Sequence, residues 1–119
     1  MELKEDYVSL EIAKLLKEKG FDEECFKYAI NDGIYNKGDY VICSAEDSVV
    51  GIPTLQMAMK WLREVHNVCI VPSLRDGEGG FYCFVYTNNY RVVKVLNKRC
   101  DTYESACKNA VKRCLTNLI

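Results

Sequence analysis

The sequence predicts an α+β protein in which an antiparallel β-sheet is flanked by helices. Residues 54–119 show the order helix, strand, strand, strand, helix, with apolar residues recurring at helical or at alternating spacing. One further amphipathic helix and a strong turn signal precede this unit. At 119 residues, 49% of them hydrophobic, we expect a single domain, 1–119. It would consist of an N-terminal helix and short hairpin segment (1–52) and a C-terminal α-β-β-β-α unit (53–119).

The first helix is predicted to run from Ser9 to about Lys19. Ser9 is a good N-cap, because its hydroxyl can accept a hydrogen bond from an amide of the first turn. Leucine, isoleucine and alanine residues form a broad apolar stripe along the helix. Gly20 is expected to end it, since glycine adopts positive φ without strain. Phe21 then folds back as an anchor.

The segment after this helix predicts a short hairpin. Cys25–Ile30 and Tyr40–Cys43 have the composition of short strands, and Asn31-Asp32-Gly33 between them is a strong turn signal. The stretch between the turn and the second strand is interpreted as a long loop. Gly51 and Pro53 mark the junction with the C-terminal unit.

The C-terminal unit begins with a helix from Thr54, its expected cap, to about His66, and Asn67 is expected to end it in the left-handed conformation. Three strands should follow, joined in part by an Asn88-Asn89 hairpin: Val68–Pro72, Phe81–Thr87 and Tyr90–Leu96.

The last helix has the clearest signal. Asp101 and Glu104 have the spacing of a capping box. Apolar residues then recur at intervals of three and four from Tyr103 to Leu118. The polar residues between them would face solvent.

The strands show no polar face. In the central strand Phe81, Cys83 and Val85 alternate with a second apolar set, Tyr82, Phe84 and Tyr86. A sheet with one face in water would show polar residues at alternate positions, so both faces should be covered. Two helices can cover one face. The N-terminal half is the first expectation for the other face, with a second subunit or a ligand as alternatives.

Charge is unevenly distributed along the chain. Residues 1–53 sum to −6 and residues 54–119 to +5, although the whole chain carries −1. The two halves would complement each other within one fold, or the basic half would face a polyanion. In the second case aromatic and basic side chains of the sheet would form a stacking platform. The candidate interaction surface consists of Tyr82, Phe84, Tyr86, Tyr90, Arg91, Lys94 and Lys98.

No motif predicts catalysis, a cofactor or a metal. The seven cysteines include no CxxC pair, and in a reducing cytosol they are interpreted as small core residues. His66 is the only histidine, and a cysteine–histidine nucleophile has no local support. The loop from Asp76 to Gly80 lacks the lysine and hydroxyl of a phosphate-binding loop. The acidic N-terminus and short apolar runs indicate neither export nor a membrane span, so we expect a cytoplasmic protein.

The order of elements in the C-terminal unit, with Pro53 ahead of Leu62 and Glu64, resembles that of the double-stranded RNA-binding domain over about 66 residues. The binding groups of that family are not carried over. Its last helix opens with a lysine cluster, whereas this chain has the acidic stretch Asp101–Glu104. Its first strand connection holds a glycine-proline-histidine element, which is replaced here by Arg75–Glu78. The resemblance therefore implies a topology and argues against duplex RNA as ligand.

A second resemblance covers most of the chain. Tyr7–Glu23, Pro53–Asn67 and Thr102–Leu118 are similar to blocks of uncharacterised small proteins of gut anaerobes and their phages or mobile elements. This resemblance implies a genetic setting but no activity. The leading hypothesis is a non-enzymatic binding or assembly protein whose partner is a second copy, as a homodimer, or another protein. The alternative is a nucleic-acid-associated accessory protein that uses the basic C-terminal half.

Overall fold

The computed structural model describes residues 3–41, 44, 46–74, 79–87 and 92–119, with the backbone alone for residues 92–99. It is an α+β protein with antiparallel sheets, as predicted. The helices are α1 (Leu10–Glu18), α2 (Leu55–His66) and α3 (Tyr103–Asn117). The strands are β1 (Lys27–Ile30), β2 (Gly33–Asn36), β3 (Val49–Ile52), β4 (Cys69–Leu74), β5 (Phe81–Tyr86) and β6 (Val92–Cys100).

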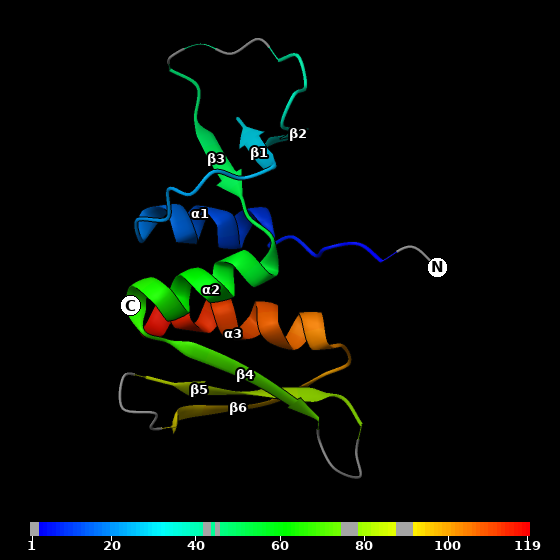
Figure 1. The fold of residues 1–119 in the computed structure, drawn as a ribbon, viewed down its shortest axis with the longest axis vertical. Coiled ribbons are helices and arrows are strands. Elements are labelled where there is room, and N and C mark those ends of the chain that lie inside the picture. The colour runs from blue at the N-terminus through cyan, green and yellow to red at the C-terminus, as the bar shows by residue number, and fades with distance from the viewer. Residues whose placement is uncertain (1–2, 42–43, 45, 75–78, 88–91) are drawn as a thin grey trace.

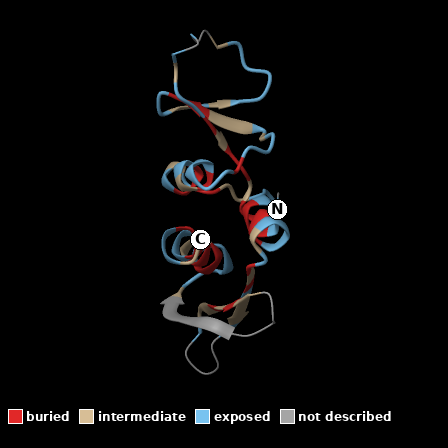
Figure 2. Ribbon diagram, turned by 90° about the vertical axis from the view of Figure 1, so that its left-hand side faces the viewer, coloured by how far each residue is buried: buried red, intermediate tan, exposed pale blue. Residues whose placement is uncertain are grey.

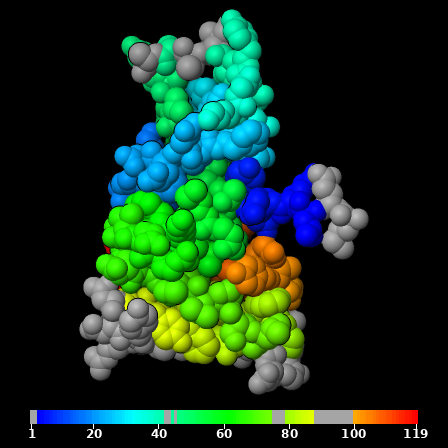
Figure 3. Space-filling model, in the orientation of Figure 1, coloured from blue at the N-terminus to red at the C-terminus, as the bar shows by residue number. Residues whose placement is uncertain are grey.

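The helices form a central layer between two sheets (Figure 1). The N-terminal sheet has the strand order β2-β1-β3 and the C-terminal sheet the order β4-β5-β6, both antiparallel. Helix α1 packs on β3, whereas α3 packs on all three strands of the C-terminal sheet and α2 on β4. Figure 2 shows the same layering from the side. The two sheets therefore lie at opposite ends of a body 51 Å long (Figure 3).

One hydrophobic cluster runs through the helical layer into both sheets. Leu16 of α1, Leu62 of α2 and Val111 of α3 have no exposed surface. The ring of Phe21 packs edge-on against Trp61 at 5.5 Å, which confirms Phe21 as an anchor that folds back after α1.

The caps of the first two helices confirm the sequence interpretation. The Ser9 hydroxyl accepts a hydrogen bond from the Ile12 amide, and the Thr54 hydroxyl accepts one from the Met57 amide, each at 3.2 Å. Asn67 ends α2 in the left-handed conformation, with φ of 56°.

The N-terminal hairpin differs from the prediction. Asn31 and Asp32 both have positive φ, 49° and 70°, so they form a two-residue turn and β2 begins at once with Gly33. The predicted second strand, Tyr40–Cys43, is wrong at Tyr40 and Val41, which lie outside any strand; its other two residues are outside the described part of the chain.

Strand β3 was not predicted. It pairs with the other edge of β1, Ile30 opposite Val49, and turns the hairpin into a three-stranded sheet. Gly51, interpreted from the sequence as a junction residue, lies within this strand. Val49, Val50 and Ile52 favour a strand, but the run is only four residues long and Gly51 interrupts it.

The three C-terminal strands confirm the sequence interpretation in their order and pairing. Residues of β4 and β5 pair from Cys69 with Tyr86 to Leu74 with Phe81, and β5 pairs with β6 on its other side. The predicted Asn88-Asn89 hairpin, with Tyr90 and Arg91, falls outside the described residues.

The N-cap of α3 is Thr102 rather than the predicted Asp101. The Thr102 hydroxyl accepts a hydrogen bond from the Ser105 amide at 3.1 Å and donates one to the Ser105 hydroxyl at 2.9 Å. Because the helix starts at Tyr103, the residue with extended backbone immediately before it is the threonine. The capping-box interpretation places the cap one residue too early.

We expect Thr102→Ala to lower the free energy of unfolding by about 1 kcal/mol, since it leaves the Ser105 amide without its acceptor. Thr102→Ser retains the hydroxyl and should restore most of the loss. Urea unfolding of the two variants measures the difference. Equal stability of the alanine and serine variants would show that the hydroxyl does not cap the helix.

Candidate interaction surface

The C-terminal sheet has a buried inner face and a partly exposed outer face. Ile70, Cys83 and Val85 are buried against the helices. Tyr82, Phe84 and Tyr86, which alternate with them on β5, point to the other side and are half-buried. The sequence therefore identified the two sets of side chains on the central strand correctly.

The three outer rings of β5 pack on one another. The ring centroids of Tyr82 and Phe84 are 5.1 Å apart in an edge-on arrangement, and those of Phe84 and Tyr86 are 6.3 Å apart. Val71 lies opposite Phe84 on β4 and is 40% exposed, although it is apolar. These four side chains, Val71, Tyr82, Phe84 and Tyr86, form what we call the aromatic face.

The prediction that the N-terminal half covers this face is wrong. Helix α1 and the N-terminal sheet lie on the other side of α3 from the C-terminal sheet (Figures 1 and 2). The reason is that α3 already occupies the inner face of the C-terminal sheet, while α1 packs on α3 and β3. Within the described part of the chain, no helix or strand lies over the aromatic face.

The structure brings together three of the seven predicted surface residues, Tyr82, Phe84 and Tyr86. Lys94 and Lys98 lie on β6, the strand next to them, and Lys94 is the backbone partner of Val85. Tyr90 and Arg91 fall outside the described residues. Three of the four aromatic residues of the predicted surface thus form one continuous row on the central strand.

A second outward face lies on the N-terminal sheet, and the sequence interpretation missed it. Tyr28 and Tyr35 are paired across β1 and β2, with ring centroids 6.0 Å apart. The Tyr35 ring lies over Gly33, because a Cβ added there would be 3.0 Å from the phenol oxygen. Val49 lies on the same face and is 45% exposed. We call these three residues the tyrosine face; two tyrosines placed symmetrically about the Asn31-Asp32 turn are the signal that could have revealed it.

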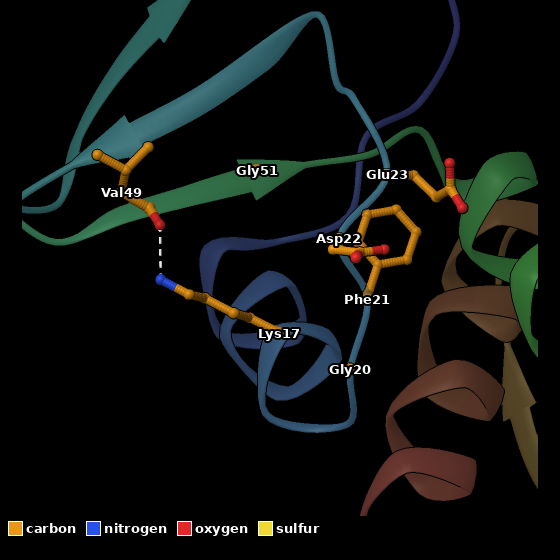
Figure 4. Close-up of a pocket in the computed structure, with 7 residues that line it drawn as sticks. All are labelled: Lys17, Gly20, Phe21, Asp22, Glu23, Val49 and Gly51. Atoms are coloured by element: carbon orange, nitrogen blue, oxygen red, sulfur yellow. Dashed lines mark hydrogen bonds between the residues drawn. The ribbon is translucent and has the colours of Figure 1, made fainter.

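A cleft of about 440 Å³ lies beside β3, between α1 and the chain that leaves it. Figure 4 shows the Lys17 ammonium group reaching across to donate a hydrogen bond to the Val49 carbonyl at 2.7 Å. Asp22 and Glu23 line the same cleft and are exposed. Lys17 blocks part of the free edge of β3, as charged residues often do at sheet edges.

Three of the described cysteines, Cys83, Cys107 and Cys114, are buried in the core. Cys83 and Cys107 are buried and their side chains are in contact, and the Cys83 thiol donates to the Ala106 carbonyl at 3.4 Å. The contact with Cys107 and burial both raise the pKa of Cys83. Burial, followed by the charge of Glu23, raises the pKa of Cys25 as well. Thiols with raised pKa values are poor nucleophiles at neutral pH. The hydrogen bond with Cys83 lowers the pKa of Cys107 instead, but the Cys107 side chain has no exposed surface.

His66 lies at the end of α2, beside Trp61. Its ring packs edge-on against Trp61 at 4.7 Å, and its Nε2 atom is buried without a hydrogen-bond partner. The described residues contain no group of three or more histidine, cysteine or acidic side chains placed to hold a metal ion. Among the described residues, no helix is both long enough and apolar enough to cross a membrane.

Comparison of the chain with protein-family models, with curated proteins and with solved structures finds no match.

Proposed function

We propose that this protein is a non-enzymatic binding or assembly protein that acts through its aromatic face. The observation that carries the proposal is the row Tyr82, Phe84 and Tyr86, with Val71 beside it, on a sheet face that no described helix or strand covers. Contiguous apolar surface is costly in water, and where it persists it usually marks a contact site. Aromatic residues dominate the binding energy of such sites.

The protein resembles small proteins of gut anaerobes and their phages or mobile elements. We therefore infer that a phage or mobile element encodes it and that it acts in the cytoplasm. An assembly role fits the described part of the chain, in which no group of histidine, cysteine or acidic side chains is placed to hold a metal ion. The thiols with raised pKa values and the isolated His66 support the same interpretation.

A second candidate function is binding of single-stranded nucleic acid. It is favoured by the position of the three rings on the central strand, which is where sheet proteins stack bases. Residues 68–100, which include the sheet, carry five lysine or arginine residues against two acidic ones. This candidate predicts an affinity that falls steeply with salt.

One experiment tests both candidates. We expect a photo-crosslinking phenylalanine analogue at position 84 to give a discrete adduct in the host cell, whereas the same analogue at the exposed Lys60 of α2 gives none. An adduct that resists nuclease supports the protein-binding function, and one that nuclease digests supports the second candidate. Equal labelling at the two positions would refute a role for the aromatic face.

A further inference from the structure

The outer edge of β3 carries main-chain groups that point away from β1. In the order β2-β1-β3, strand β3 is the last strand of its sheet. Along an antiparallel pair, residues that exchange hydrogen bonds with the partner strand alternate with residues whose amide and carbonyl groups point the other way. The Asn31 amide donates to the Ser48 carbonyl at 3.1 Å, so these two residues form a hydrogen-bonded pair. Counting on from Ser48, it is Val49 and Gly51 that direct their main-chain groups to the outer edge.

This edge opens into the cleft of about 440 Å³, which both residues line. The Lys17 ammonium group confirms the direction, because it donates to the Val49 carbonyl at 2.7 Å from the side away from β1 (Figure 4). It takes the place that the amide of a neighbouring strand would occupy. In the described part of the chain, no hydrogen bond from another residue reaches the outer amide or carbonyl of Gly51, which is only half-buried. Lys17 therefore covers one acceptor of the edge and leaves the rest of it open.

The charged side chains of the cleft favour a cation. Among its described lining residues these are Lys17, Asp22 and Glu23. The Lys17 ammonium group is already held by the Val49 carbonyl. Asp22 and Glu23, in the segment that follows α1, are exposed, and neither forms an ion pair with another described residue. Two unpaired carboxylates thus lie beside an open sheet edge.

We propose that an extended segment of a partner protein, carrying a lysine or arginine, adds to the outer edge of β3 as a fourth strand of the N-terminal sheet. Its main chain pairs with Val49 and Gly51, which takes about three residues, because only alternate residues of an edge offer their groups. An incoming amide replaces Lys17 at the Val49 carbonyl. The cation of the segment lies beside Asp22 and Glu23. This site is separate from the aromatic face and does not depend on it.

The chemistry of the edge selects this partner over two others. Donors and acceptors that recur at every second residue match another main chain in extended conformation. A nucleic acid would bring its phosphates to Asp22 and Glu23, which repel them. In a second copy of the chain the same edge is partly blocked by its own Lys17, so two copies would have to release both ammonium groups to pair.

Selection from a displayed library of random peptides of about eight residues gives the first test. We expect the peptides retained by the native protein to be enriched in lysine or arginine together with β-branched residues, which favour an extended main chain. Their affinity should fall as salt is raised. Retention of no peptide, or of peptides without a basic residue, would overturn the inference.

Two substitutions on the edge test where the most enriched peptide binds. Val49→Pro removes an outer amide that β1 does not use, so the sheet should tolerate it while the peptide binds at least about ten-fold more weakly. Lys17→Met frees the Val49 carbonyl and removes the competing cation, so the peptide should bind about three- to ten-fold more tightly. A gain of affinity distinguishes a blocked binding edge from a lysine that only stabilises the fold.

A charge variant with a matched control tests the acidic pair. Asp22→Asn/Glu23→Gln should weaken binding about five-fold at low salt and flatten its salt dependence. Glu18→Gln/Glu64→Gln changes the net charge equally at exposed positions outside the cleft and should bind like the native protein. Equal affinities of these two variants would show that Asp22 and Glu23 do not hold the cation of the peptide.

Far-UV circular dichroism and Trp61 fluorescence show whether each variant is folded, and the Lys17 and charge variants decide the test if Val49→Pro is not. A native dimer that Val49→Pro dissociates would mean that the edge binds a second copy, and the inference of a foreign segment would be wrong. Failure of the proposed function is read separately, from the position-84 crosslink, because the aromatic face is on the other sheet.

Discussion

Leu62→Ala is expected to lower the free energy of unfolding by about 2–5 kcal/mol, the usual cost of a cavity at a fully buried leucine. Leu62 lies in α2, within the helical layer, and belongs to the cluster that reaches into both sheets. A small domain has about 5–15 kcal/mol of stability in total. The variant should therefore unfold at a much lower urea concentration.

The same measurement tests the predicted single domain, residues 1–119. Far-UV circular dichroism reports on all the elements, and Trp61, the only tryptophan, reports on the contact between α2 and Phe21. One cooperative core should give the same shifted midpoint with both probes. Val65→Ala, on the same helix at a position 55% exposed, should change stability by less than about 0.5 kcal/mol. Separate midpoints for the two probes would indicate two units.

The parts of the fold that the sequence predicted are those with local signals. Ser9, Thr54 and Asn67 act within one turn of their own helices, so their residue types suffice to place the ends of α1 and α2. Alternation along Phe81–Tyr86 likewise assigned each side chain to the correct face of the C-terminal sheet. In these cases neighbours in the sequence determine the geometry.

The predictions are wrong where the structure of a segment depends on residues that are distant in the sequence. Strand β3 pairs with the free edge of β1. Its three β-branched residues favour a strand, but Gly51 interrupts them and was interpreted as a junction. The exposed aromatic face has a similar cause. Alternation shows that a face of the sheet is apolar, but it does not show what covers that face. Whether the N-terminal half covers it depends on the side of α3 on which that half packs. Three of the seven candidate surface residues, Tyr82, Phe84 and Tyr86, were therefore assigned to the correct face, but what covers that face was not predicted.

The tyrosine face shows the same limit. Tyr28 and Tyr35 become neighbours only once the Asn31-Asp32 turn fixes the register of β1 with β2. The incorrect second strand placed Tyr35 in a loop, so the pairing was lost with the register. A correct two-residue hairpin would have predicted both tyrosines on one face.

Alkaline pH is expected to weaken the fold through the buried thiol pair. An unfolded cysteine has a pKa of about 8.5, whereas contact with Cys107 and burial raise the pKa of Cys83 in the folded protein. The folded state then holds a proton that the unfolded state has released. This contribution is fully present below about pH 8.5 and is lost as pH rises, at about 1.4 kcal/mol per pH unit. The same hydrogen bond lowers the pKa of Cys107, which offsets part of this loss, so at pH 10 the net loss should be less than about 2 kcal/mol.

A matched pair of variants isolates this effect from the titration of tyrosines and lysines. Because the two thiols are in contact, they titrate as a pair and must be removed together, as Cys83→Ala/Cys107→Ala. That variant should lose less stability between pH 8 and pH 10 than Cys69→Ala, which removes a half-buried thiol and leaves the pair intact. Urea unfolding at each pH gives, for each variant, the slope of the free energy of unfolding against pH. Parallel slopes would mean that Cys83 ionises as readily in the folded protein as in the unfolded chain, and that the thiol contact does not hold its proton.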